Sequence, residues 1–243
     1  MNRLCLILSA MGVAGVSSLG LADLETLIPP EAKIALPRVA LLIQPMVLVL
    51  GATTLGCWAA PKMGLAAPVL QAVLSRAPLK GVMRKSIEPA LLGGLIVAVI
   101  LLAYGLLTQT IFAGANGPKQ IERMLAFQPP LISKLLYGGV AEELLARWGV
   151  MSGVALAAFK LGLGRTRALW TGTLIAALLF GLGHLPLLFA IMPSPPLWLI
   201  SAVIIGNIVP GIIFGLLFWR RGIESAMMGH GMGHLLATLA TAI

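Results

Sequence analysis

Seven stretches of this 243-residue chain are apolar and long enough to cross a lipid bilayer as helices. The hydrocarbon core of a bilayer requires about 20 mostly apolar residues in helical conformation, and long apolar runs without alternation favour helices over a β-barrel. The seven stretches are residues 4–22, 39–60, 90–113, 131–159, 168–192, 197–219 and 223–243. A shorter stretch, 64–78, is broken by Pro68 and Pro78, which predicts an interfacial or re-entrant segment.

The composition agrees with a membrane protein. Hydrophobic residues make up 59% of the chain and charged residues only 10%, whereas a soluble domain needs more charge to cover its surface. No polar or low-complexity stretch indicates a second domain. We therefore predict an all-α, polytopic transmembrane helix bundle of about seven spans, which forms one integral membrane domain over residues 1–243. The net charge of +9 is better explained by basic cytoplasmic loops than by nucleic-acid binding.

The basic residues predict the orientation of the chain. If the N-terminus lies in the cytoplasm, the inner segments contain more lysine and arginine than the outer ones, as is typical of membrane proteins. The inner set is Arg3, Lys62, Arg76, Lys80, Arg84, Lys85, Lys160, Arg165, Arg167, Arg220 and Arg221. The outer set is Lys33, Arg38, Lys119, Arg123 and Lys134. We therefore expect a cytoplasmic N-terminus. As a separate expectation, the membrane is a bacterial inner or plasma membrane.

The first apolar stretch has a second interpretation. Arg3, an apolar run and the sequence LGLAD also resemble a secretory signal that is cleaved after Ala22. Cleavage would leave six spans in the same orientation. Residues 1–22 are therefore either a cleaved signal or a retained span, and the interpretation of the remaining chain is the same in both cases.

Four further residues receive structural interpretations. Cys5 and Cys57 lie in separate apolar stretches without metal-type spacing, so we expect no disulfide framework. Asn207, in the middle of its stretch, is interpreted as an interhelical hydrogen-bonding residue. Glu224 follows Arg220 and Arg221 closely and is interpreted as a charge at the membrane interface.

Three charged residues interrupt the fourth apolar stretch. An ionisable residue at the bilayer centre costs about 2.5–3.5 kcal/mol on insertion scales, and such residues face the interior of a bundle. Glu143 and Arg147 are four residues apart in the favourable order for an ion pair, which indicates a structural role. Glu142 points about 100° away around the helix and has no local partner. A mid-membrane carboxylate of this kind indicates function.

All three histidines of the chain also lie in apolar stretches. His184 occurs in the sequence FGLGH, and His230 and His234 occur in GHGMGH. The latter pair, four residues apart, projects both rings from one helix face. All three lie near the middle of their stretches, so one shared depth with Glu142 is feasible. Glycines beside each histidine allow close helix packing or leave room for a bound peptide.

Such a cluster suits hydrolysis of an amide bond. A glutamate beside a histidine can deprotonate water, and further imidazole donors can stabilise an oxyanion. Alternatively, Glu142, His184 and His230 could bind zinc with an activated water. No serine or cysteine lies in an evident nucleophile motif, which argues against an acyl-enzyme.

At these residues the sequence resembles the CPBP family, which comprises CAAX proteases, bacteriocin-processing enzymes and Abi proteins. The family is known by a Glu-Glu-x-x-x-Arg motif, a Phe-x-x-x-His motif and a late histidine followed four residues later by Asn, Asp or a similar group. The matching residues are Glu142, Glu143 and Arg147, then Phe180 and His184, then His230 and His234. The resemblance covers residues 131–243, which would form the catalytic core.

The resemblance implies a role for each residue. Glu142 would activate water together with His184, while His230 and His234 would line the oxyanion site. Glu143, Arg147 and Phe180 would be supporting residues. The family's mechanism has been described both as glutamate-based and as metal-dependent; we favour glutamate and water without a resident metal, with zinc as the alternative. Position 234 departs from the pattern, because this chain has histidine where the family often has asparagine.

The sequence thus favours an intramembrane endopeptidase, of glutamate type or metallo-type, that acts on membrane-associated protein or peptide substrates. A proton- or ion-coupled transporter is an alternative, because mid-membrane Glu, Arg and His also form relays; the lack of repeat symmetry argues against it. A catalytically silent scaffold of the same family is a further alternative. The presence of Glu142, His184 and His230 argues against that loss of chemistry.

Overall fold

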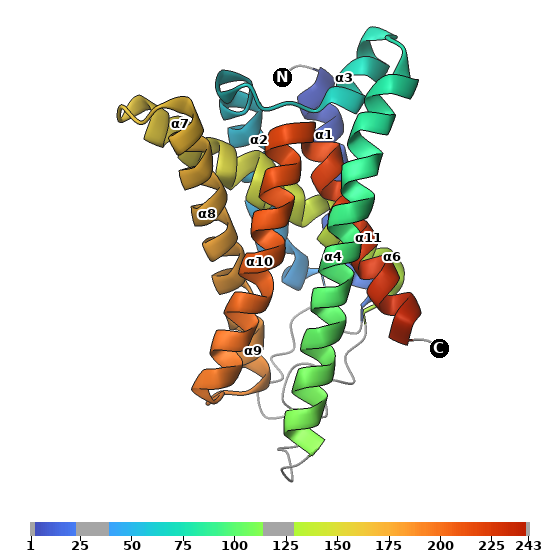
Figure 1. Cartoon of the computed structure of the whole chain (residues 1–243), viewed down its shortest axis with the longest axis vertical. Coiled ribbons are helices and arrows are strands. Elements are labelled where there is room, and N and C mark those ends of the chain that lie inside the picture. Colours follow the sequence, from blue (N-terminus) through green and yellow to red (C-terminus); the bar gives the residue numbers. More distant parts are fainter. Residues whose placement is uncertain (1–2, 23–38, 114–128, 242–243) are drawn as a thin grey trace.

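The all-α prediction is confirmed. The computed structural model describes residues 3–22, 39–113 and 129–241, which form helices and short connections without a strand (Figure 1). The elements are α1 (Arg3–Ser17), η1 (Ser18–Leu21), α2 (Ala40–Ala59), η4 (Pro61–Met63), α3 (Pro68–Ser75), α4 (Leu79–Ala113), α6 (Leu131–Ser133), η5 (Lys134–Glu142), η6 (Leu144–Met151), α7 (Ser152–Lys160), α8 (Arg165–Gly183), α9 (Leu185–Ile191), α10 (Leu197–Arg221) and α11 (Ile223–Thr241). The outer-loop residues Lys33, Arg38, Lys119 and Arg123 lie outside the described residues.

Five of the predicted spans are helices that are long and apolar enough to cross a membrane among the described residues. They are Arg3–Leu21, Ala40–Ala59, Leu79–Leu107, Arg165–Ala190 and Leu197–Arg221. The other two predicted spans are also helical, as the α6-to-α7 segment and as α11. These two contain the glutamates, the arginine and the histidine pair of the motifs, and such polar residues lower the hydropathy of a span. The protein is an integral membrane protein.

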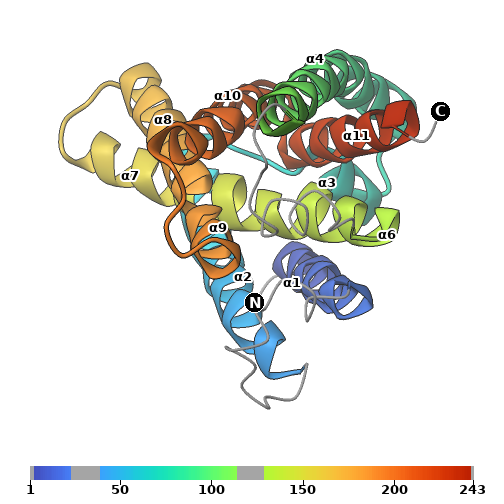
Figure 2. The ribbon, with the colours of Figure 1, turned by 90° about the horizontal axis from the view of Figure 1, so that it is seen from below.

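The helical segment that runs from α6 to α7 is the centre of the bundle. It contacts α1 and α2 on one side and α8 and α11 on the other. Figure 2 shows this segment between α1 and α2 on one side and α4, α10 and α11 on the other. The charged motif is therefore surrounded by helices, as expected for ionisable residues within a membrane.

The central segment is π-helical over most of its length, which the sequence did not predict. Elements η5 and η6 together run from Lys134 to Met151, with Glu143 between them. A π-helix pairs residues five apart and occurs mostly in short pieces at functional sites. Its apolar and polar pattern does not differ clearly from that of an α-helix over two turns, so periodicity alone does not detect it.

The outer surface of the bundle is apolar. Along α4, for example, Leu92, Leu95 and Val99 are more than half exposed. In an aqueous protein such a surface would be an interaction site; around a helix bundle it is the surface that meets lipid acyl chains. The interfacial segment predicted at 64–78 contains the short helix α3 beside the start of α4.

The structure corrects the interpretation of the two cysteines and that of Glu224. Cys5 of α1 and Cys57 of α2 form a disulfide, with their Cα atoms 6.0 Å apart; α1 packs along α2, and so brings together residues 52 positions apart. Glu224 is only 8% exposed, and its Oε1 accepts a hydrogen bond of 2.8 Å from the backbone N–H of Leu70. It therefore caps the N-terminus of α3 and is not an open interface charge.

Candidate active site

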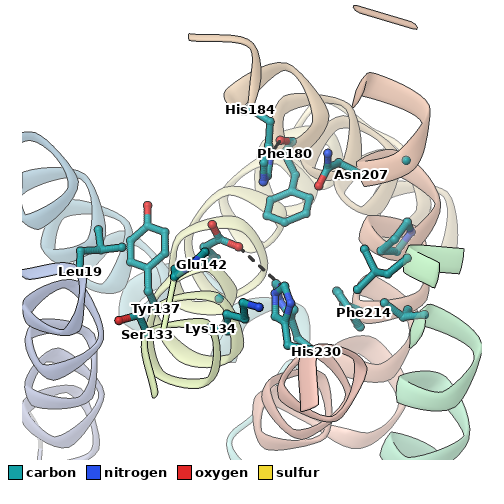
Figure 3. A pocket seen from close by; sticks show the side chains of 17 residues that line it. Leu19, Ser133, Lys134, Tyr137, Glu142, Phe180, His184, Asn207, Phe214 and His230 are labelled. Carbon is teal, nitrogen blue, oxygen red and sulfur yellow. Dashed lines mark hydrogen bonds and ion pairs between the residues drawn. The ribbon is translucent and has the colours of Figure 1, made fainter. Parts of the chain in front are cut away.

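The predicted site residues line two adjoining cavities. The first has a volume of about 180 Å³ and contains Glu142, His184, His230 and His234 on its wall. The second, of about 190 Å³, lies between η6 and α8 and shares Glu142 and His184 with the first. Figure 3 shows Glu142 directed toward His230, with Phe180 and His184 on the facing helix. Three helical segments distant in sequence thus bring the motif residues together.

The adjacent glutamates have different surroundings. The Glu142 side chain is 17% exposed, and its Oε2 lies 3.9 Å from Nε2 of His230. The Glu143 side chain is fully buried, and its Oε1 lies 3.0 Å from Nη1 of Arg147. The predicted ion pair of Glu143 and Arg147 is therefore present, and Glu142 faces the cavity instead.

Glu143 also contacts the histidine cluster. Its Oε1 lies 2.8 Å from Nδ1 of His230, and this oxygen is an acceptor when the carboxylate is ionised. Arg147 in turn donates a hydrogen bond of 3.1 Å from Nη2 to the carbonyl oxygen of Gly211 in α10. A chain of contacts thus runs from α10 through Arg147 and Glu143 to the ring of His230, and it fixes the orientation of that ring.

Two phenylalanines hold the same cluster from the other side. Phe214 of α10 stacks on His230, with ring centroids 4.5 Å apart and planes inclined by 16°. The guanidinium carbon of Arg147 lies 4.6 Å from the ring centroid of Phe180, a distance at which a cation and a ring attract each other. Phe180 also meets His184 edge to face, with centroids 4.8 Å apart. The Phe-x-x-x-His motif therefore contacts the Glu-Glu-x-x-x-Arg motif directly.

The tautomer of His184 follows from its partner. Its Nδ1 lies 2.7 Å from the carbonyl oxygen of Phe180, and a carbonyl oxygen can only accept. The proton of the neutral ring is therefore on Nδ1. Nε2 of His184 remains as an acceptor on a side chain that lines both cavities. Such a nitrogen can take a hydrogen bond or a proton from water.

The histidine pair of α11 shares one proton position. Nε2 of His230 lies 3.1 Å from Nε2 of His234. When Nδ1 of a neutral His230 donates to Glu143, its Nε2 is an acceptor, and His234 supplies the N–H between the rings. When His230 is protonated, its Nε2 becomes a donor, and the carboxylate of Glu143 stabilises that charge. In both states this N–H lies between the two rings, so an oxygen in the cavity can accept it only in place of the ring-to-ring hydrogen bond.

Paired glycines on η5 make room for this arrangement. A Cβ atom on Gly138 would lie 2.9 Å from Nε2 of His234 and 3.5 Å from Nε2 of His230. A Cβ atom on Gly139 would lie 3.2 Å from the Cα atom of Gly231. Gly138 thus leaves space for the rings, while Gly139 allows the backbones of η5 and α11 to approach closely.

The donor set fits zinc only in part. Two nitrogens of the histidine pair lie close together, and Glu143 contacts the other ring nitrogen of His230, as carboxylates commonly do with metal-bound histidines. Among the described residues, however, no group of three or more His, Cys, Asp or Glu side chains converges as metal ligands. The set Glu142, His184 and His230 is not such a group in this arrangement.

Several residues that line the first cavity were not assigned to the site from the sequence, among them four with a polar or aromatic side chain. Lys134 and Tyr137 lie on η5, and Asn207 and Phe214 lie on α10; all four line the first cavity. Lys134, which was predicted to belong to an outer loop, donates a hydrogen bond of 3.3 Å to Oγ1 of Thr238. Asn207 was interpreted as bonding between helices, but its Nδ2 donates to the carbonyl of Val203 in its own helix. The sequence could have indicated the two α10 residues, because positions 207, 211 and 214 are spaced so that they share one face of a helix.

The comparisons with known proteins agree with the sequence motifs. Residues 125–236 match a family model described as type II CAAX prenyl endopeptidase Rce1-like. The match contains every motif residue and confirms the resemblance to the CPBP family over the C-terminal half of the chain. The chain matches no curated protein and no solved structure in the other two comparisons.

Proposed function

From the membership of residues 125–236 in the Rce1-like protease family, we propose that this membrane protein is an endopeptidase in which Glu142 activates a water molecule. One observation carries the mechanism: the carboxylate of Glu142 opens onto a cavity that His184, His230 and His234 also line. Its neighbour Glu143 is buried in an ion pair, which leaves Glu142 as the carboxylate available to a substrate.

The proposed reaction uses the side chains as follows. Glu142, assisted by Nε2 of His184, takes a proton from water, and the resulting hydroxide attacks the carbonyl carbon of the scissile amide. The carbonyl oxygen becomes an oxyanion, which accepts the N–H of the His230 and His234 pair in place of the hydrogen bond between the two rings. Collapse of the tetrahedral intermediate breaks the C–N bond, and protonated Glu142 returns the proton to the leaving amine. The products are a carboxylate and an amine.

The two adjoining cavities support a peptide substrate. They meet at Glu142 and His184, so an extended chain can place residues on both sides of the scissile bond. The walls of the second cavity include Leu145, Val150 and Leu179, which favours an apolar substrate side chain on that side. Membrane-associated proteins or peptides provide such segments. An inner bacterial membrane and a cytoplasmic N-terminus belong to this proposal as well.

Zinc remains the alternative form of the site. If bound, it would be held by the nitrogens of the histidine pair, with Glu142 or His184 as a further ligand, and it would supply a Lewis acid for the water and the carbonyl. The chain's own residues would keep their places. Glu143 would orient His230 through Nδ1, and the proximity of Phe180 and Phe214 would exclude bulk water from the rings.

Hydrolysis in ¹⁸O-labelled water tests the proposal directly. The purified protein in lipid nanodiscs is incubated with peptides extracted from membranes, and products are identified by mass spectrometry. We expect wild-type protein to generate peptides that carry ¹⁸O in a new C-terminal carboxylate, and Glu142→Gln to generate none. Glu88→Gln is the matched control, because Glu88 is an exposed partner of Arg84 and lines neither of the two cavities. Equal product formation by Glu142→Gln would contradict the assignment.

A further inference from the structure

A third cavity, lined in part by basic side chains, lies away from the candidate active site. It has a volume of about 320 Å³ and is formed where α10 ends, beside α3 and the beginning of α4. This is the end of the bundle at which Figure 1 marks the N-terminus. Three basic side chains line it: Lys85 from α4, and Arg220 and Arg221 from α10. No acidic side chain is among the described residues of its wall.

The backbone around this cavity is fixed by long-range hydrogen bonds. Gly222, which follows the arginines, has a φ of 98°, a conformation that glycine adopts without strain. The next residue, Ile223, donates a backbone hydrogen bond of 3.0 Å to the carbonyl of Ala66. On the α4 side, the carbonyl of Ser86 accepts a hydrogen bond of 2.9 Å from Oγ of Ser225. The helices that carry the three basic residues are therefore held in fixed positions.

The end of α10 does not neutralise these charges. Arginines in the last turn of a helix interact favourably with its C-terminal dipole, but that dipole is equivalent to only about half an elementary charge. The acidic residues nearest in sequence do not line the cavity: Glu224 accepts a hydrogen bond from Leu70, and Glu88 pairs with Arg84 at 2.7 Å. The described wall of the cavity therefore carries three basic side chains and no carboxylate.

The walls of the cavity combine this charge with apolar surface. Trp219 and Phe218 contribute to the lining, and Trp219 packs edge to face against Trp170 at a centroid distance of 5.5 Å. Tryptophan is enriched where a membrane protein meets the headgroup layer. The cavity therefore offers cations for an anionic group at headgroup depth, beside aromatic surface for attached acyl chains.

We propose that this cavity binds the phosphate group of an anionic ligand, with an acidic phospholipid headgroup as the source that the apolar wall favours. Paired arginines bind phosphate oxygens with several directed hydrogen bonds, and basic pockets between membrane helices are typical sites for acidic headgroups. The site shares no lining residue with the cavity of Glu142. It therefore stands independently of the proposed peptidase activity.

Thermal unfolding of the purified protein in detergent micelles tests this site. Phosphatidylglycerol, at about a hundred times its dissociation constant, is expected to raise the unfolding temperature of wild-type protein by roughly 5–10 °C. Phosphatidylcholine with the same acyl chains is the zwitterionic control, and inorganic phosphate separates a free anion from a lipid. An equal rise with inorganic phosphate alone would assign the site to free phosphate and contradict the lipid as source.

Matched variants connect the effect to the cavity. We expect the rise with phosphatidylglycerol to disappear in the double variant Arg220→Gln, Arg221→Gln. It should persist in Lys80→Gln, Arg167→Gln, which removes the same charge from exposed residues that do not line the cavity. An equal rise in both double variants would overturn the proposal. If the first double variant does not fold, Lys85→Gln leaves the α10 end unchanged and must still reduce the rise.

Discussion

The two faces of the central helix use the same residue types for different purposes. On the cavity face, Gly138 and Glu142 lie beside the histidine pair. On the packed face, Gly139 and Glu143 lie against the backbone of α11 and the buried guanidinium of Arg147. Adjacent residues of one kind thus have different surroundings, because successive side chains of a helix point in different directions. The comparison separates residues that we expect to act on a substrate from those that hold the site together.

The largest effect is expected for Glu142. Glu142→Gln keeps the shape of the side chain but removes the base, so we expect turnover to fall by about 10²–10⁴. The thermal unfolding temperature should change little, since the side chain is partly exposed to the cavity and makes no close ion pair. Parallel peptide-cleavage and unfolding measurements on wild type, Glu142→Gln and Glu143→Gln check this. A Glu142→Gln protein that unfolds as readily as Glu143→Gln would remove the distinction between the two faces.

The motif residues of this candidate site could be selected from the sequence because the motifs are local. Pairs such as Glu143 with Arg147, or His230 with His234, are set by helical spacing and need no knowledge of the fold. That the motifs converge could be inferred from the cost of leaving isolated ionisable groups in lipid. The predicted positions of Glu142 and His184 on the wall of one cavity agree with that inference.

What the sequence did not predict depends on contacts between distant segments. Glu224 meets the amide of Leu70, which is 154 positions away, and Cys5 meets Cys57 across two helices. Asn207 lines the cavity only because α10 packs beside α8 and α11. The π-helical winding of the central segment is likewise set by its packing on several helices, and a single-sequence pattern does not encode it.

On the packed face, the ion pair is expected to determine stability. Arg147→Met leaves the Glu143 carboxylate buried without its cation, which costs about 3–5 kcal/mol. Glu143→Gln leaves the guanidinium in the same condition, although Arg147 keeps its hydrogen bond to Gly211. The double variant removes both charges and should unfold at a higher temperature than either single variant. Thermal unfolding in detergent measures all three.

If the loss of stability in the double variant were the sum of the losses in Arg147→Met and Glu143→Gln, the ion pair of Glu143 and Arg147 would be contradicted. Cleavage activity adds a second readout, because Glu143 also holds Nδ1 of His230. At a temperature where the protein is folded, Glu143→Gln should lose more turnover than Arg147→Met. The Gln side chain can accept the hydrogen bond from Nδ1 but does not stabilise a charged ring. Equal turnover in the two variants would indicate that Glu143 supports the fold alone.

His234 distinguishes a hydrogen-bond donor from a metal ligand. If it supplies an N–H to the oxyanion, His234→Ala should reduce turnover by about 10²–10³, and His234→Asn should retain substantial activity because the amide offers an N–H from a similar place. If it is a zinc ligand, both variants should lose bound metal together with activity. Metal analysis of purified wild type and His234→Asn, with cleavage measured with and without a chelator, separates these cases. Stoichiometric zinc that is lost with activity in His234→Asn would overturn the metal-free mechanism.

The smallest effects are expected at Gly138 and Gly139. Gly138 lies on the cavity face and Gly139 on the packed face, so the two positions again compare the faces. In Gly138→Ala the new Cβ meets Nε2 of His234 at 2.9 Å, which is the far end of a side chain that can shift. The ring moves away from its place opposite Nε2 of His230, so turnover should fall, by about tenfold for a partial loss of one oxyanion donor, while unfolding changes little.

Gly139→Ala is the matched variant, since it adds the same methyl group one residue later. Its Cβ meets the Cα and N atoms of Gly231 at 3.2 and 3.3 Å, and this backbone can move only if η5 and α11 separate. We expect a lower unfolding temperature, equivalent to about 1–3 kcal/mol for overpacking, and a smaller loss of turnover in the protein that remains folded. Gly138→Ala should therefore lose mainly turnover, whereas Gly139→Ala should lose mainly stability. If both variants lose stability equally and keep their turnover, Gly138 belongs to the packing of the helices, and the cavity face begins only at Glu142.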